Sequence, residues 1–201
     1  MAKLYFYYGV MGSSKSANLL LQAHSFDEKG IEVLCLKSSL DTRDGNKIKS
    51  RLGIERECAL IEKDTDLFHA IKTYYVLLKE NKRNLQWILV DEAQFLTKEQ
   101  IDALALVVDE FNINVCCYGL RTDFQTNFFE GSKRLMEIAD DFIEIKSMCK
   151  CGRKASVNAR INSNGELILN GSQVEIEGDT IYEPMCRKCY NEQVLKQFNS
   201  K

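Results

Sequence analysis

The feature that most constrains this chain is a run rich in glycine and serine near its start. The run is Gly9-Val10-Met11-Gly12-Ser13-Ser14-Lys15-Ser16, between an apolar, aromatic stretch (residues 4–8) and a helical pattern (15–29) that ends at Gly30. A strand that leads through such a loop into a helix is the context of a phosphate-binding loop, or P-loop. Successive backbone N–H groups would surround an anion, and the helix N-terminus would add partial positive charge.

Two side chains of this loop predict its chemistry. In P-loop proteins the lysine contacts the β- and γ-phosphates of ATP, and the next hydroxyl ligates Mg²⁺; here these residues are Lys15 and Ser16. The residue before the lysine is usually glycine but here is Ser14. If the backbone needs a positive φ there, serine costs about 1–2 kcal/mol, which predicts weaker nucleotide binding. The alternative is an ordinary turn between a strand and a helix.

A second motif is an apolar stretch that ends in two carboxylates. Ile88-Leu89-Val90 is followed by Asp91 and Glu92. In P-loop proteins a carboxylate at this place holds the Mg²⁺ shell, so Asp91 is expected to do so with Ser16. Glu92 is then placed to accept a proton from an attacking hydroxyl or to orient a water molecule. A solvated loop after a buried strand is the alternative, but the two motifs together favour a nucleotide site.

Strand-like and helix-like stretches alternate through the first three-quarters of the chain. The pattern predicts strands at residues 4–8, 31–37, 87–90, 113–118 and 142–145, and helices at 15–29, 64–79, from Thr97 onward, and 134–139. Thr97 and Gln100 have the spacing of a capping box. This alternation predicts an α/β fold, a mostly parallel sheet with flanking helices.

Four of the eight cysteines are clustered near the end of the chain, as Cys149 with Cys151 and Cys186 with Cys189. Two close pairs joined by a β-rich stretch predict a tetrahedral Zn²⁺ site, and four thiolates leave no open position, so its role is structural. Free thiols or a redox pair are the alternatives. The other four cysteines (Cys35, Cys58, Cys116, Cys117) fit buried thiols.

The amino-acid composition of the sequence changes at about Cys149. Residues 149–190 are rich in Asn, Gly and Ser, with short alternating stretches at 175–177 and 180–182, and a helix is expected at 191–197. We therefore expect a nucleotide-binding domain over residues 1–148 and a smaller zinc-binding β-rich domain with a C-terminal helix over 149–201.

Composition argues against other classes of protein. The 201 residues are 45% hydrophobic and 28% charged, as in ordinary globular proteins. The net charge of −2 does not fit a general nucleic-acid binder. No apolar run approaches the roughly 20 residues of a membrane span, and no signal peptide is visible. A cytoplasmic protein without a membrane or nucleic-acid partner is expected.

Five stretches in register make the chain resemble the type II, or cytosolic-type, thymidine kinases over nearly its whole length, in a bacterial-looking form. They are Tyr8-Gly9-Val10-Met11 with Lys15-Ser16; Asp41-Thr42-Arg43; Val90-Asp91-Glu92-Ala93-Gln94-Phe95-Leu96; Cys117-Tyr118-Gly119-Leu120-Arg121-Thr122-Asp123-Phe124; and Cys151-Gly152-Arg153-Lys154-Ala155 with Tyr182 and Cys186-Arg187-Lys188-Cys189-Tyr190. The resemblance implies transfer of the γ-phosphoryl group of ATP to the 5′-hydroxyl of thymidine, or alternatively deoxyuridine. It also implies a homotetramer and feedback inhibition by dTTP.

The resemblance further implies a role for each matching residue. Glu92 would be the general base, and Asp41 and Arg43 would belong to a loop near the phosphates. A lasso after the cysteine knuckle would cover the base. The implied ATP-binding residues are Gly9, Val10, Met11, Gly12, Ser13, Ser14, Lys15, Ser16, Arg43, Asp91, Glu92, Ala93 and Gln94; the implied thymidine-binding residues are Met11, Asp41, Phe95, Leu120, Phe124, Val174, Ile176, Gly178 and Tyr182.

Each assignment has a plainer alternative. Met11, Phe95 and Leu120 also fit core residues, Tyr182 a cross-strand packing residue, and Arg43 a surface charge. At the level of the whole protein, the first rival is a P-loop ATPase that acts on nucleic acid through the zinc unit. The second is a non-catalytic nucleotide-binding regulator, a hypothesis suggested by Ser14.

Overall fold

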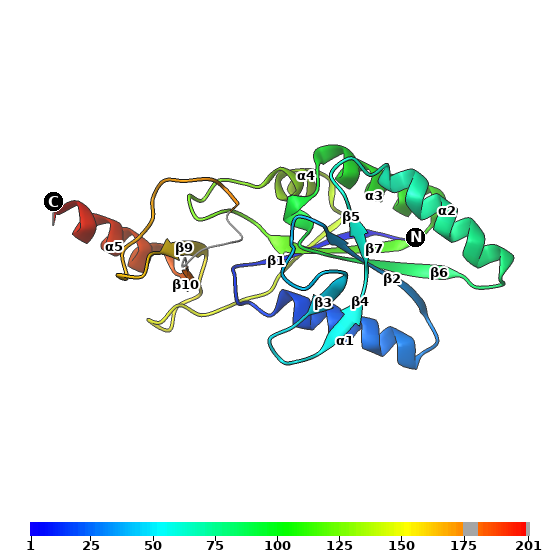
Figure 1. The fold of residues 1–201 in the computed structure, drawn as a ribbon, viewed down its shortest axis with the longest axis horizontal. Helices are drawn as coiled ribbons and strands as arrows, with labels where there is room; N and C mark the ends of the chain where they lie inside the picture. Colours follow the sequence, from blue (N-terminus) through cyan, green and yellow to red (C-terminus); the bar gives the residue numbers. More distant parts are fainter. Residues whose placement is uncertain (175–180, 200–201) are drawn as a thin grey trace.

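The computed structural model describes residues 1–174 and 181–199. A six-stranded sheet forms the centre of the larger part of the molecule (Figure 1). The strand order is β5-β2-β6-β7-β1-β8, and every neighbouring pair is parallel. The strands are β1 (Leu4–Gly9), β2 (Glu32–Ser38), β5 (Ala59–Ile61), β6 (Leu85–Asp91), β7 (Asn114–Leu120) and β8 (Asp141–Glu144).

Helices cover both faces of this sheet, which confirms the predicted α/β fold. Alternate residues of β6 point to opposite faces, so Leu89 packs with α1 (Lys15–Glu28) while Ile88 and Val90 pack with the other helices. The helices of that second face are α2 (Leu67–Glu80), α3 (Lys98–Phe111) and α4 (Glu130–Ile138), and a short 3-10 turn, η1 (Ala93–Phe95), follows β6.

The predicted helix signals are present. The Thr97 side chain accepts from the Gln100 backbone, and the Gln100 side chain accepts from the Thr97 backbone, which confirms the capping box of α3. Gly30 adopts a positive φ of 65° just after α1. None of the helices in the described ranges is both long and apolar enough to cross a lipid bilayer.

Several predicted boundaries were wrong. The strands β6 and β7 extend farther than residues 87–90 and 113–118, so that Asp91 and Leu120 are the last residues of their strands. The helix predicted at 134–139 begins at Glu130, and the strand predicted at 142–145 is Asp141–Glu144. Four strands were not predicted: β5, the hairpin formed by β3 (Lys47–Lys49) and β4 (Glu55–Glu57), and, in the smaller part of the molecule, β9 (Val157–Ile161).

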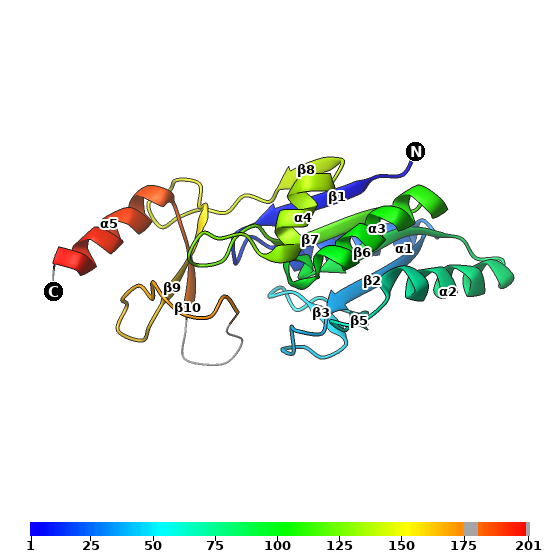
Figure 2. The same ribbon diagram turned by 90° about the horizontal axis from the view of Figure 1, so that it is seen from above.

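The smaller part of the molecule lies beyond the carboxyl edge of the sheet (Figures 1 and 2). It consists of an antiparallel pair, β9 (Val157–Ile161) and β10 (Ile181–Met185), followed by α5 (Arg187–Asn199). The helix expected at 191–197 thus begins four residues earlier and contains Cys189. The strand expected at 180–182 corresponds to the start of β10, and the stretch 175–177 lies outside the described residues.

A glycine in α4 marks a close contact between two backbone segments. A Cβ atom on Gly131 would lie 2.5 Å from the carbonyl oxygen of Ala93 and 2.7 Å from that of Leu96. Alanine normally stabilises a helix by about 1 kcal/mol relative to glycine. Here the backbone would have to move, so we expect Gly131→Ala to lower the free energy of unfolding by about 1–3 kcal/mol, measured by urea denaturation.

Gly45→Ala is the comparison for this prediction, because it separates backbone strain from steric contact. Unlike Gly131, Gly45 has a positive φ of 55°, and nothing lies within 4 Å of its added Cβ atom, so there only the backbone strain of about 1–2 kcal/mol acts. Unchanged or increased stability of Gly131→Ala would contradict the close approach of α4 and η1.

Candidate active site

The carboxyl ends of neighbouring strands bring the two predicted motifs together. Gly9 of β1 is paired in register with Leu120 of β7, and Asp91 of β6 with Lys37 of β2. Because ligands of open parallel sheets bind at this edge, the position itself favours a binding site. A cavity of about 490 Å³ opens there.

Most of the predicted site residues line this cavity. Four do not: Gly9, Val10 and Ser13 lie behind the loop surface, and Ala93 is buried in the core beneath it. Ile176 and Gly178 lie outside the described residues. The predicted residues that line the cavity are Met11, Gly12, Ser14, Lys15, Ser16, Asp41, Arg43, Asp91, Glu92, Gln94, Phe95, Leu120, Phe124, Val174 and Tyr182.

The phosphate loop has the backbone that its sequence predicted. Gly12 has a φ of 72° and Ser14 a φ of 63°, so the strained left-handed position that usually carries glycine carries serine here. Lys15 is the first residue of α1, and its Nζ donates to the carbonyl oxygen of Val10 at 2.9 Å. Burial lowers the pKa of Lys15, while the carboxylates of Glu92 and Asp91 raise it. Gly9 is required because a Cβ there would lie 2.6 Å from the carbonyl oxygen of Ile145.

Two oxygen ligands suitable for a hard cation lie side by side beneath the loop. Burial together with the neighbouring Glu92 raises the pKa of the Asp91 carboxyl, while the Ser16 side chain beside it lowers that pKa. A divalent cation at this point would favour the ionised carboxylate. A hydroxyl and a carboxylate beside a triphosphate site are the protein ligands that Mg²⁺ takes in such sites.

The carboxylate of Glu92 is held from two directions. Gln94 Nε2 donates to Glu92 Oε2, and Gln94 Oε1 accepts from the backbone N–H of Leu120 at 2.9 Å. From the other side, Arg43 Nη2 donates to Glu92 Oε1 at 3.0 Å while its Nε donates to Asp41 Oδ1 at 2.6 Å. Glu92 has a φ of 51°, a strained conformation for a residue other than glycine. Backbone strain therefore occurs at the residue whose side chain is held from two directions.

The cavity has an apolar side that faces away from the phosphate loop. The rings of Phe95 and Phe129 meet edge to face, with centroids 5.7 Å apart. Phe124 lies beneath the Arg160 guanidinium, whose carbon is 5.0 Å from the ring centroid. Sequence analysis missed Phe129 as a lining residue because nothing in its neighbourhood distinguishes it from a core aromatic.

The part of the chain just before residues 175–180 is tied to the loop that follows β7. Gln173 Nε2 donates to Asp123 Oδ2 at 2.9 Å, and Gln125 Nε2 donates to the Leu169 carbonyl at 3.0 Å. Val174 and Tyr182, on either side of residues 175–180, both line the cavity. The contacts of Asp123 and Gln173 had no signal in the sequence, because a polar pair fifty positions apart forms no local motif.

One buried asparagine joins the small part to the phosphate loop. Asn158 of β9 is only 3% exposed. Its Oδ1 accepts from the Met11 N–H at 2.7 Å, and its Nδ2 donates to the Thr122 carbonyl at 2.7 Å. Val10 packs into the apolar cluster of the small part. These contacts connect the phosphate loop, the loop after β7 and β9.

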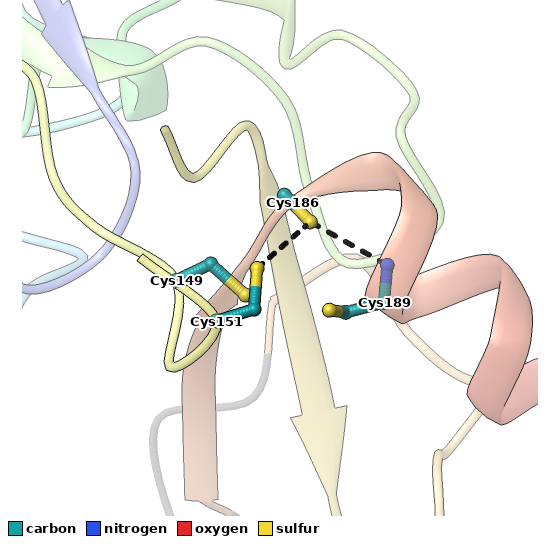
Figure 3. A group of neighbouring side chains, drawn as sticks. All are labelled: Cys149, Cys151, Cys186 and Cys189. Carbon is teal, nitrogen blue, oxygen red and sulfur yellow. Dashed lines mark hydrogen bonds between the residues drawn. The ribbon is translucent and has the colours of Figure 1, made fainter. Parts of the chain in front are cut away.

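The four clustered cysteines converge on one point (Figure 3). Their sulfur atoms all lie within 4.8 Å of one another, and Cys151 Sγ is 3.6 Å from Cys186 Sγ. That separation is close to the edge of about 3.8 Å of a tetrahedron with Zn–S bonds of 2.3 Å, and far above the S–S bond of about 2.05 Å in a disulfide. The cluster therefore fits a zinc ion better than a redox pair.

The local backbone explains why these four residues meet. Gly152 has a φ of 81°, and its N–H bonds to the Cys149 carbonyl at 2.9 Å, which turns the chain between the first two cysteines. Cys186 stands between the end of β10 and the start of α5, and its sulfur accepts from the Cys189 N–H in the first turn of α5. The guanidinium of Arg153 lowers the pKa of Cys151, which favours the thiolate that a metal requires.

Comparison with known proteins now identifies the family. A family model described as thymidine kinase matches residues 2–190. The chain belongs to the thymidine kinase family. It is 45% identical over 195 residues to a thymidine kinase of Pasteurella multocida (strain Pm70), covering 96% of this chain and 99% of that protein.

Two further relatives also match this chain over nearly their whole length. A thymidine kinase of Enterobacteria phage T4 is 45% identical over 197 residues, covering 98% of this chain and 99% of that protein. One from Coxiella burnetii (strain RSA 493 / Nine Mile phase I) is 47% identical over 189 residues, covering 94% of each. The resemblance seen in the sequence and the expected class, a deoxynucleoside kinase, are confirmed. The nucleic-acid ATPase and the non-catalytic regulator gain no support.

Ser14 leads to a prediction about stability and affinity together. Glycine at a φ of 63° avoids the strain of serine, so we expect Ser14→Gly to raise the free energy of unfolding by about 1 kcal/mol. It should also tighten ATP binding in titration calorimetry, because the loop no longer holds that strain. Lys82→Gly is the control: Lys82 has a φ of 58° in a turn after α2, outside the cavity, and should gain stability without a change in ATP affinity. Equal ATP affinity in Ser14→Gly and the parent would contradict the prediction.

The cysteine cluster leads to a prediction about metal content. Cys151→Ser removes one of four thiolates, so the purified protein should lose bound zinc and unfold at a lower temperature. Cys58→Ser, a half-buried lone thiol outside the cluster, should keep its zinc. Elemental analysis measures the zinc content of both variants, and calorimetry measures their melting temperatures. If Cys151→Ser kept its zinc and its melting temperature were unchanged, a four-thiolate site would be contradicted.

Proposed function

We propose that this protein transfers the γ-phosphoryl group of ATP to the 5′-hydroxyl of thymidine, giving dTMP and ADP, in pyrimidine deoxynucleoside salvage. The observation that carries the proposal is the Glu92 carboxylate, which is held by Arg43 and Gln94 and lines the same cavity as the phosphate loop and the rings of Phe95 and Phe124. Deoxyuridine is the second acceptor to test, since it differs from thymidine by a single methyl group.

The phosphate side of the cavity holds ATP in this proposal. The loop N–H groups that are not already bonded, unlike those of Met11 and Ser13, surround the phosphates, and Lys15 neutralises β- and γ-phosphate charge. Ser16 and Asp91 would hold Mg²⁺, which would offset the charge of the phosphates. Ala93 and Gln94 support this side from η1, and Gln94 does so through its bond to Glu92.

The acceptor side holds the nucleoside. Met11, Phe95, Leu120 and Phe124 offer apolar surface to the pyrimidine ring. Asp41 acts through Arg43, which it orients. In this proposal the lasso completes the pocket through Val174, Tyr182 and, in the part of the chain outside the described residues, Ile176 and Gly178.

The reaction is an in-line displacement. The 5′-oxygen of the nucleoside forms a bond to the γ-phosphorus while the bond from that phosphorus to the β–γ bridging oxygen breaks. Glu92 accepts the hydroxyl proton, and ADP leaves with the bridging oxygen. Because such a transition state needs little covalent help, most of the acceleration comes from positioning and from charge neutralisation.

The other finer features belong to the same proposal. Residues 1–148 form the nucleotide-binding domain and 149–201 the zinc and lasso domain, with Zn²⁺ in a purely structural role. We place the enzyme in the cytoplasm, as a homotetramer that dTTP inhibits. Sedimentation analysis tests the tetramer, and loss of activity on addition of dTTP tests the inhibition.

The test of the function is monophosphate formation by the purified protein with ATP, Mg²⁺ and each common deoxynucleoside. Glu92→Gln keeps the size of the side chain but cannot accept the proton, so turnover should fall roughly 10²- to 10⁴-fold while ATP binding stays nearly intact. Glu99→Gln, on the exposed side of α3, should behave like the parent. Equal loss of binding and turnover in Glu92→Gln would contradict its role as the base.

A further inference from the structure

Three basic side chains that line the cavity are already bonded to other groups of the protein. Arg43 bonds to both Asp41 and Glu92. Lys37, fully buried in β2, donates to the Lys47 carbonyl at 3.0 Å and lies 3.9 Å from Asp41. Lys15 faces its own loop. Negative charge that develops on the transferring phosphoryl group can be neutralised by Lys15 from one direction. A further cationic side chain is therefore needed to neutralise it from the opposite direction.

The hairpin that the sequence did not predict brings a further arginine to this place. Arg51 lies in the turn between β3 and β4, which closes through the bond from the Ser50 N–H to the Ile54 carbonyl, 2.9 Å long. The Arg51 guanidinium lies 3.9 Å from the position that a Cβ atom on Gly12 would occupy, and both residues line the cavity. Its charge is close enough to lower the pKa of Lys15. Within residues 1–174 and 181–199, no carboxylate pairs with it.

The hairpin is fixed to the body of the protein, so the position of this turn is defined. Ile48 of β3 is 1% exposed and packs against Leu19 and Leu20 of α1. Arg56 of β4 bonds through both of its terminal nitrogens to the Asp27 carboxylate of α1. Together with the bond between Lys37 and Lys47, these contacts hold both strands over the phosphate loop.

A second feature of the same turn indicates a ligand. Ser50 is 6% exposed and lines the cavity. Its hydroxyl has no hydrogen-bond partner among the described residues. A buried hydroxyl without a partner is unfavourable, and a phosphate oxygen of ATP would satisfy it.

We propose that Arg51 is a further catalytic residue, whose guanidinium contacts the γ-phosphoryl oxygens of ATP, and that the Ser50 hydroxyl donates to a phosphate oxygen beside it. This inference rests on the proposed kinase function. Arg51 forms and breaks no bond; it neutralises charge as the phosphoryl group passes to the acceptor. Its planar fork suits two oxygens at once. Arg43, in contrast, orients the base.

The test compares Arg51→Ala, Arg51→Lys and the control Arg83→Ala in thymidine phosphorylation. Arg83 pairs with Glu32 at the opposite edge of the sheet, so its removal should leave kcat unchanged. Arg51→Ala should lower kcat roughly 10²- to 10³-fold with little change in the KM for thymidine. Arg51→Lys should recover part of the loss, and added guanidinium ion should partly restore Arg51→Ala alone, a response that a purely structural role would not give.

The outcomes separate this inference from the proposed function. If the parent enzyme forms no dTMP, the function itself is wrong. If the parent is active and Arg51→Ala keeps its kcat within twofold, or loses it without any recovery from lysine or guanidinium, the catalytic role of Arg51 is overturned. Ser50→Ala should raise the KM for ATP roughly 3- to 10-fold, and an unchanged KM would overturn the role of its hydroxyl.

Discussion

The side-chain amide of Gln94 joins the ends of two neighbouring strands, and the site depends on this one residue. It accepts from the Leu120 N–H at the end of β7 and donates to Glu92 at the end of β6. Gly119 leaves room for it, because a Cβ there would lie 2.8 Å from Gln94 Oε1. A carboxylate at the rim of an open cavity would otherwise sample several rotamers. The amide and Arg43 together hold it in one orientation at the cavity.

A second amide has the same function for the small part of the molecule. Asn158 accepts from the Met11 N–H, so that donor is already bonded and the loop is tied to β9. The same side chain reaches Thr122 in the loop that carries Phe124. Order at the cysteine cluster, which fixes the ends of β10 and the start of α5, is therefore transmitted through β9 to the phosphate loop. A zinc ion held by these cysteines would have a structural role, and its effect would extend to the phosphate loop.

Features that depend on local rules could be predicted from the sequence. The positive φ at Ser14 follows from the loop motif, Asp91 at a strand end from an apolar run, and the cysteine cluster from its spacing. The β3–β4 hairpin could not be predicted, because its strands are three residues long, mostly charged, and held by contacts to α1. Asn158 was missed because its role depends on hydrogen bonds to two residues that are distant in sequence, and such contacts leave no local pattern. The start of α5 was placed too late because Arg187 to Cys189 suggested a loop rather than a helical turn.

The pairing of Arg43 with Glu92 also bears on how the phosphoryl transfer is achieved. In a loose transition state the nucleophile has formed little of its new bond, so its proton is needed late and the direction of the attacking oxygen matters early. Glu92, the base in the proposed reaction, is held by Gln94 and Arg43 and would supply that direction. Negative charge on the phosphoryl oxygens is then best neutralised by cationic side chains that are not bonded to the base. Lys15 in the loop and Arg51 in the turn of the β3–β4 hairpin are such side chains. The separation of the two arginines, one on the carboxylates and one beside Gly12, follows from these two different demands.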